Sequence, residues 1–207
     1  MRPVSACVAL FAAIVSWGFP PQKPVEAKGD QAPAEAYADP DAYNVYAAAL
    51  AIDGWYWESS NTILILKEIP PREWALGAPS EVLRGDATFA KEMEPVFKSF
   101  SEANREPRVL NLDVDLHRPH RFVSGAELEE AFRKGQEGKT HDVWQGFRET
   151  FPNAAGYLIL SAVGFNSEKT IALVYLEHRC GNRCGAANYY VMQKLGGVWV
   201  KYLPQAQ

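Results

Sequence analysis

The sequence predicts an α+β fold, with N-terminal helices packed on a C-terminal antiparallel β-meander. Apolar residues recur at helical spacing in four segments of the first three quarters of the chain. From Tyr157 onward the apolar residues alternate instead, and turn sequences separate one alternating run from the next. Helices first and strands last is the order typical of the α+β class. The four helical segments are 39–53, 86–104, 124–135 and 142–150.

The first 27 residues predict a secretory signal peptide. Arg2 precedes an apolar run at 6–19, which is about 14 residues long and short of the roughly 20 that a membrane-spanning helix needs. The alternatives are an uncleaved anchor and a lipoprotein. Cys7 does not fit a lipoprotein signal, because in such a signal the apolar run precedes the cysteine, whereas in this chain the run follows Cys7.

Removal of this leader would leave an exported protein, periplasmic or secreted, with no stable membrane insertion. Residues 28–38 are rich in alanine, proline and charge, so we expect them to form a flexible linker. The remaining residues, 39–207, are enough for a single domain with a sizeable core.

The first half of this domain is expected to contain two helices and two strands. Asp39 can cap a helix that begins at Pro40, whereas Pro95 should kink the second helix or divide it in two. The run 62–66 lacks alternation, which favours a strand buried on both faces. The segment 108–116 alternates apolar and polar residues, as a half-buried strand does.

The second half is expected to contain two short helices and the meander. Ser124 and Glu127 have the spacing of a capping box, and Pro152 ends the helix at 142–150. We expect these helices to pack on one face of the sheet, an element order compatible with the curved sheets of cystatin-like or NTF2-like proteins. The expected strands of the meander are 157–165, 171–178, 188–195 and 198–203.

Several short motifs in the C-terminal half resemble those of a family of uncharacterised bacterial exported proteins. The motifs are Val-Gly-Phe-Asn at 163–166, Ala-Leu-Val-Tyr at 172–175, Cys-Gly-Asn-Arg-Cys-Gly at 180–185 and Gly-Val-Trp at 197–199. The helix around Ala42–Tyr46 is also similar to that family's opening. The resemblance supports the architecture and implies no catalytic residues.

Cys180 and Cys184 are the two cysteines that would remain after the leader is removed. In an exported protein a close pair is more often a disulfide than a metal or catalytic site. Gly181 and Gly185 beside them would permit unusual backbone angles at a hairpin tip. We expect a structural clamp; a ligand-binding loop that uses the clamp, and redox catalysis, are the alternatives.

Asp113, Asp115, His117 and His120 form the sharpest polar cluster in the sequence. Carboxylates and imidazoles of this kind bind metals or act in hydrolysis. In a strand, however, alternate residues are roughly 6.6–6.8 Å apart, so that Asp113 and His117 would be about 13 Å apart. A solvated polar face is the interpretation that this spacing favours, and we expect no metal ion there.

His178 is the other candidate catalytic residue, because it follows Glu177 and precedes the cysteine loop. A reduced cysteine beside an imidazole can be a nucleophile. Adjacent strand residues point to opposite faces, so Glu177 should not orient His178.

Consecutive aromatic residues at 55–57, together with Trp74, Trp144 and Trp199, are a third feature. An exposed aromatic side chain could stack on a sugar ring or anchor a partner. Burial at the edge of the core is the alternative.

The composition of the chain and the motifs it lacks restrict the range of possible functions. A formal net charge of −4 without a basic run lacks the footprint of a nucleic-acid binder. The sequence contains no nucleophile elbow, zinc-protease motif or phosphate-binding glycine loop, so no cofactor is expected. We expect a non-enzymatic exported module that binds a protein, peptide or glycan ligand in the cell envelope. The alternatives are a small hydrolase that uses Asp113, Asp115 and His117, and a structural envelope protein.

Overall fold

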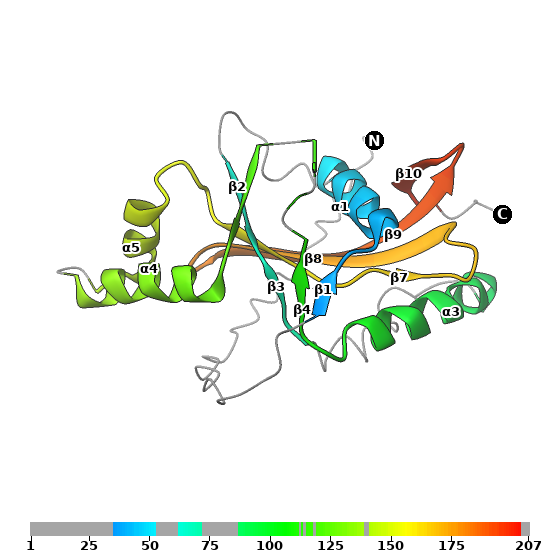
Figure 1. Cartoon of the computed structure of the whole chain (residues 1–207), viewed down its shortest axis with the longest axis horizontal. Helices are drawn as coiled ribbons and strands as arrows, with labels where there is room; N and C mark the ends of the chain where they lie inside the picture. The colour runs from blue at the N-terminus through cyan, green and yellow to red at the C-terminus, as the bar shows by residue number, and fades with distance from the viewer. Residues whose placement is uncertain are drawn as a thin grey trace, which may run out of the picture. The chain divides into compact units, whose positions relative to one another are not determined.

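The computed structural model describes residues 35–52, 62–71, 87–111, 113, 115–117, 119–138 and 141–203 (Figure 1). All of them belong to one compact unit, Pro33–Gln207. The predicted signal peptide and the first part of the predicted linker lie outside the described residues.

A seven-stranded mixed sheet organises the molecule, and the C-terminal antiparallel meander within it is confirmed. The strands β6, β8, β9 and β10 follow one another as antiparallel neighbours, while the two-residue strand β7 (Gly164–Phe165) also pairs with β8. Gly196 and Gly197 connect the last two strands with φ angles of 57° and 86°, which glycine adopts without strain. The bounds of the four meander strands are β6 Tyr157–Leu160, β8 Ile171–Gly181, β9 Cys184–Leu195 and β10 Val198–Lys201.

The strand β2 (Ile63–Leu66) lies inside this sheet, as its uninterrupted apolar run predicts. It pairs in parallel with β5 (His120–Val123) on one side and with β6 on the other. The parallel pairs were not predicted. They arise because α4 (Gly125–Glu137) and α5 (Val143–Thr150) carry the chain from β5 over to β6.

A second, three-stranded sheet has the order β1-β4-β3. Its strand β1 (Glu35–Tyr37) falls within the predicted linker, and Tyr37 is buried, so the linker prediction does not hold for these residues. The strand β4 (Arg108–Leu110) pairs with β1 and with β3 (Glu68–Ile69). The predicted strand 108–116 therefore ends after three residues.

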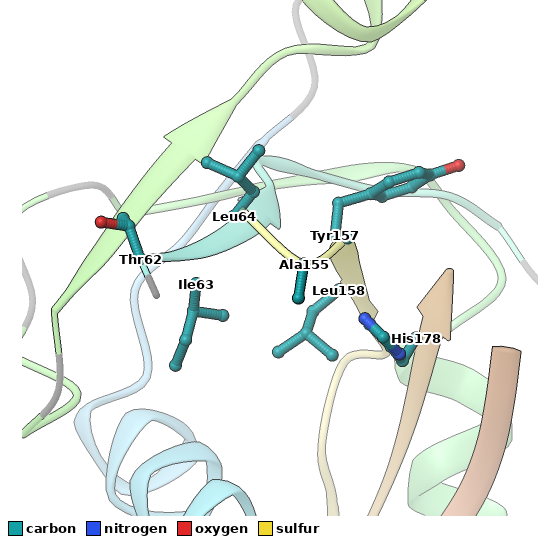
Figure 2. A pocket seen from close by; sticks show the side chains of 8 residues that line it. Thr62, Ile63, Leu64, Ala155, Tyr157, Leu158 and His178 are labelled. Atoms are coloured by element: carbon teal, nitrogen blue, oxygen red, sulfur yellow. The ribbon is translucent and has the colours of Figure 1, made fainter. Parts of the chain in front are cut away.

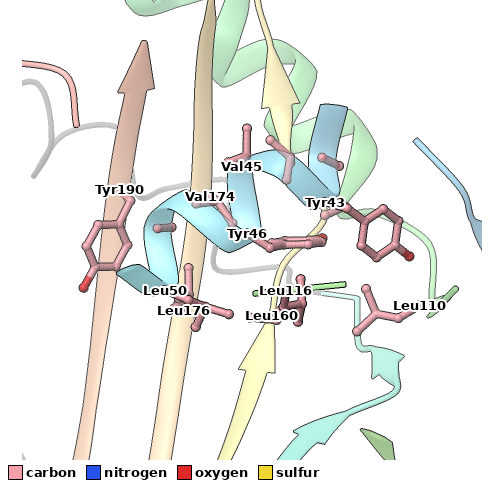
Figure 3. Close-up of a cluster of buried hydrophobic side chains, with 14 of the residues drawn as sticks. Tyr43, Val45, Tyr46, Leu50, Leu110, Leu116, Leu160, Val174, Leu176 and Tyr190 are labelled. Carbon is pink, nitrogen blue, oxygen red and sulfur yellow. The ribbon is translucent and has the colours of Figure 1, made fainter. Parts of the chain in front are cut away.

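Helices cover both faces of the seven-stranded sheet, not one face as expected. The helix α1 (Pro40–Ile52) packs Val45, Tyr46 and Leu50 against one face, where Val174 and Leu176 of β8 meet them (Figure 3). The other face carries α3 (Ala87–Ala103) over the first half of β8 and the α4–α5 pair over β2 and β6. The alternating side chains of β8 and β6 are thus buried on both faces.

The helix ends follow their sequence signals. The side chain of Asp39 accepts a hydrogen bond from the Asp41 amide at the start of α1. Ser124 and Glu127 form the expected capping box at α4, and Asp142 caps α5. The helix α3 runs as a single element past Pro95, so its division into two helices did not occur.

Buried side chains satisfy the backbone where the predicted strand 157–165 is interrupted, between β6 and β7. The Tyr46 hydroxyl donates to the Ser161 carbonyl at 2.7 Å. The Val163 amide donates to the Tyr37 hydroxyl at 2.9 Å. These partners replace the strand hydrogen bonds that the break removes.

Within the described residues, no helix is both long and apolar enough to cross a membrane.

Candidate functional site

The hairpin of β8 and β9 extends beyond the strands beside it. On one side, the last residue of β8 that pairs with β6 is Arg179, opposite Tyr157. On the other side, β10 pairs with β9 only from Met192 to Leu195. The tip residues, Gly181 to Cys184, therefore have no third strand beside them among the described residues.

Cys180 and Cys184 lie at disulfide distance at this tip, with Cα atoms 5.1 Å apart. Pairing shifts by one residue here, because Arg179 faces Gly185 while Gly181 faces Cys184. Cys180 is thus the extra residue of a β-bulge, and a bond to Cys184 would hold the bulge in place. A covalent link across a bulge limits slippage of the hairpin register.

The two glycines of the tip do not adopt the unusual backbone angles that we expected. Gly196 and Gly197 are the glycines with positive φ among the described residues, and Gly181 and Gly185 are not. A Cβ atom at Gly181 would make an ordinary contact of 3.4 Å with the Cys184 Cβ. At Gly185 it would lie 3.0 Å from the His178 carbonyl, which is tight. Close packing against the His178 carbonyl explains the glycine at 185, whereas nothing in the structure requires a glycine at 181.

Glu177 and His178 point to opposite faces of the sheet, as predicted. Glu177 is opposite Ile159 on the face that α4 and α5 cover, and it accepts a hydrogen bond of 2.7 Å from the Arg179 Nε. Arg179 also hydrogen-bonds the Tyr157 hydroxyl. Glu177 therefore orients Arg179 and not His178.

His178 lies beside a cavity of about 20 Å³ at the start of β2 and β6 (Figure 2). Its side chain is 8% exposed, and burial lowers the pKa of the imidazole to about 4. Gly156 permits this packing, because a Cβ there would lie 2.6 Å from Nε2. A cavity of this volume has room for about one water molecule and none for a substrate. The other lining residues are Thr62, Ile63, Leu64, Ala155, Tyr157 and Leu158.

Asp113, Asp115 and His117 lie in an exposed turn after β4 and not on a strand. The Asp115 side chain accepts from the His117 amide at 2.6 Å, and its second oxygen lies 3.3 Å from the His117 Nδ1. The hydrogen bond from the His117 amide, more than any other contact, lowers the pKa of Asp115. Both side chains are about three quarters exposed, at 77% for Asp115 and 75% for His117. The turn brings the carboxylate and imidazole together in open solvent.

The predicted catalytic residues lie in two parts of the described fold, the turn after β4 and the strand β8. Asp115 contacts His117, whereas Asp113 is exposed and bonds through its amide to the Asn111 side chain. His178 lies on β8 beside the small cavity, whereas the other three residues lie in the turn after β4. Groups of three or more metal-binding side chains are also missing from the described part of the chain.

The aromatic residues divide into two groups. Trp55, Tyr56, Trp57 and Trp74 lie outside the described residues. Trp144 and Trp199 are buried, at 8% and 5% exposure. Neither buried ring is available to a ligand.

One surface feature was missed from the sequence, namely the outer edge of β9 from Cys184 to Asn188. Gly185, Ala187 and Asn188 are exposed, and β10 ends before it reaches them. The edge arises because β9 is longer than β10, whereas the predicted strand 188–195 included only Asn188 of these residues.

Searches against protein-family models, curated proteins and solved structures find no match for the chain. The resemblance to bacterial exported proteins and the cystatin-like or NTF2-like comparison therefore stay predictions.

Proposed function

We propose that the chain is an exported, non-enzymatic binding module that contacts a protein, peptide or glycan ligand of the cell envelope through the tip of the β8–β9 hairpin. The observation that carries the proposal is the exposed tip, Asn182 to Gly185, with a cysteine pair at disulfide distance at its base. A bond between these cysteines would hold the loop in one conformation. Fixing a loop before binding lowers the entropy cost of association. The predicted signal peptide would bring the chain to an oxidising compartment, where the pair would be bonded.

The polar groups at the tip suit recognition. Asn182 offers an amide donor and acceptor, and Arg183 offers a guanidinium that binds carboxylates or stacks on planar groups. Both side chains are exposed. Peptides and cell-wall glycans with peptide stems present matching carboxylates and amides.

The test uses the purified mature chain with insoluble cell-wall glycan and with soluble envelope proteins. We expect the wild type to sediment with the glycan or to capture a defined envelope protein. Asn182→Ala with Arg183→Ala should reduce that binding at least fivefold. Arg105→Ala is the matched control, since its side chain is exposed and remote from the hairpin in sequence. Absence of binding in both assays, or equal binding by the tip variant, would contradict the proposal.

A hydrolase that uses Asp113, Asp115 and His117 is the second candidate, because Asp115 holds His117 in a carboxylate–imidazole pair. For a hydrolase, Asp113→Asn and His117→Ala should each abolish a measured activity and leave the melting temperature nearly unchanged. Retention of that activity in both variants would exclude these residues. A structural envelope protein is the third candidate, favoured if neither binding nor activity is found.

A further inference from the structure

The two long hairpins at the end of the chain close with turns of different kinds. Gly196 and Gly197 connect β9 to β10 with positive φ angles, which the favoured two-residue hairpin turns require. Asn182 and Arg183 connect β8 to β9, and neither belongs to the described residues with positive φ. A two-residue turn without positive φ splays the strands that it joins. The loop at 182–183 therefore needs another feature to keep its strands paired.

The β-bulge at Cys180 gives the tip a choice between two pairings. Arg179 faces Gly185, so an uninterrupted ladder would place Cys180 opposite Cys184 and leave a loop of three residues. The bulge instead places Gly181 opposite Cys184 and shortens the loop to two residues. Loops of three residues are also common in hairpins. The same sequence is thus compatible with a two-residue and a three-residue pairing.

A bond between the cysteines is compatible with only one of these pairings. The Lys194 amide donates to the Thr170 carbonyl opposite it, so that every second pair of the hairpin is hydrogen-bonded, and in the three-residue pairing Cys180 and Cys184 would be one of them. Opposed residues of such a pair have Cβ atoms about 5.5 Å apart. A disulfide requires Cβ atoms about 3.5–4.5 Å apart. The bond therefore favours the bulged, two-residue pairing.

We propose that Cys180 and Cys184 form a redox switch of the hairpin tip. When bonded, they hold the two-residue pairing, and when reduced, they release the tip to the three-residue pairing. The inference rests on the proposed function, because the switch changes the loop that presents Asn182 and Arg183 to the ligand. The reduced form should therefore bind the ligand at least fivefold more weakly than the bonded form.

The tip is open to a reductant and can change its pairing without disturbing the rest of the sheet. Cys184 is exposed and Cys180 is half-buried, so a reductant reaches Cys184 first. The strand β6 pairs with β8 only as far as Arg179, and β10 pairs with β9 only from Met192. Within the described part of the chain, the tip therefore shares no ladder with a third strand that would resist a local change.

A dithiol is the class of reductant that completes the reaction. Its thiolate attacks the Cys184 sulfur, the bond between the cysteines breaks, and the electron pair goes to the Cys180 sulfur, which takes up a proton. The second thiol of the reductant loses its proton and displaces the Cys184 sulfur, which is protonated in turn. The chain gains two electrons and two protons, and the dithiol becomes a disulfide.

Nuclear magnetic resonance of the full mature chain tests the pairing without a ligand. The amides of a hydrogen-bonded pair face each other across the ladder. The bonded form should therefore show an amide–amide contact between Gly181 and Cys184. Dithiothreitol should remove this contact and leave one between Cys180 and Cys184. The contact between Leu195 and Val198, which flank the glycine turn, is the internal control and should persist.

Cys180→Ser with Cys184→Ser should show the reduced pairing with or without dithiothreitol, and the reduced wild type provides the same test if this variant does not fold. Binding to cell-wall glycan and envelope proteins is measured on the same samples. A Gly181–Cys184 contact that survives reduction, or equal ligand binding by the bonded and reduced forms, would overturn the switch. If neither form binds a ligand, the proposed function fails, and the amide contacts still decide whether the pairing changes.

Discussion

Asn104 forms two hydrogen bonds with the backbone of Ala162, one through each end of its amide. The Asn104 Nδ2 donates to the Ala162 carbonyl at 3.0 Å, and the Ala162 amide donates to the Asn104 Oδ1 at 2.8 Å. The same Nδ2 donates to the Phe100 carbonyl at 2.8 Å. A side chain at the end of α3 thus pairs with the interrupted strand as a neighbouring strand would.

Asn104→Ala should lower the free energy of unfolding by about 2–4 kcal/mol, because it leaves the amide and carbonyl of Ala162 buried without partners. Urea unfolding followed by circular dichroism measures the change. Asn153→Ala, at an exposed position, is the control and should change stability by less than about 0.5 kcal/mol. Similar values for the two variants would show that the Asn104 bonds contribute little.

His178 should make stability depend on pH between about 6.5 and 4. Burial lowers the pKa of the folded imidazole to about 4, so over this range the unfolded state binds a proton that the folded state does not. Stability is therefore full above the unfolded pKa and falls as the pH drops, by about 2–3 kcal/mol in total. Unfolding free energies measured across this range provide the test.

His178→Gln should flatten that pH dependence relative to the wild type, whatever its effect on stability at pH 7. Asn153→Ala removes no titratable group from an exposed position, so it is the control and should keep the wild-type slope. An unchanged slope in His178→Gln would mean that His178 is protonated in the folded protein at its ordinary pKa.

Gly146→Ala should destabilise the α4–α5 pair by about 1–3 kcal/mol. A Cβ at Gly146 would overlap the Ala131 carbonyl and the Gly135 amide, both of which are backbone atoms that cannot move aside. Gly125→Ala is the matched control in α4, because nothing lies within 4 Å of its Cβ position. Thermal unfolding should show a lower melting temperature for Gly146→Ala alone, and equal effects would contradict the close helix contact.

The helices and the meander could be predicted because their signals are local. The capping box at Ser124 and the apolar spacing of α1 depend on residues within one or two helical turns. The break after Leu160 was missed because its stability comes from distant residues, with Tyr37 and Asn104 bonding Val163 and Ala162. The parallel pairs of β2 depend on where α4 and α5 lead the chain, which periodicity alone does not reveal.

Some features of the candidate site could be predicted from the sequence and others could not, for similar reasons. The close approach of Cys180 and Cys184 follows from their spacing, and the opposite faces of Glu177 and His178 follow from strand geometry. The turn at Asp115 and His117 could not be predicted in this way. The alternation in 108–116 is compatible with a strand, and a strand forms there only if another strand pairs with it. Side-chain hydrogen bonds to the backbone stabilise the turn instead.

The cysteine pair should stabilise the oxidised protein by about 2 kcal/mol, as the chain-entropy estimate gives for so short a loop. Cys180→Ser with Cys184→Ser should lose that amount in urea unfolding under oxidising conditions. Reductant should bring the wild type to the value of the double variant and leave the variant unchanged. Equal stability of wild type and variant without reductant would mean that the pair is not bonded.

Photo-crosslinking from position 182 in the organism that carries the protein tests the central claim most directly. A photoreactive residue that replaces Asn182 should give a discrete adduct with an envelope protein or glycan, of a mass distinct from a dimer of the chain. The same residue in place of exposed Lys91 on α3 should give no such adduct. An adduct from position 182 alone is the predicted result, whereas no adduct, or the same adduct from both positions, would contradict a ligand site at the hairpin tip.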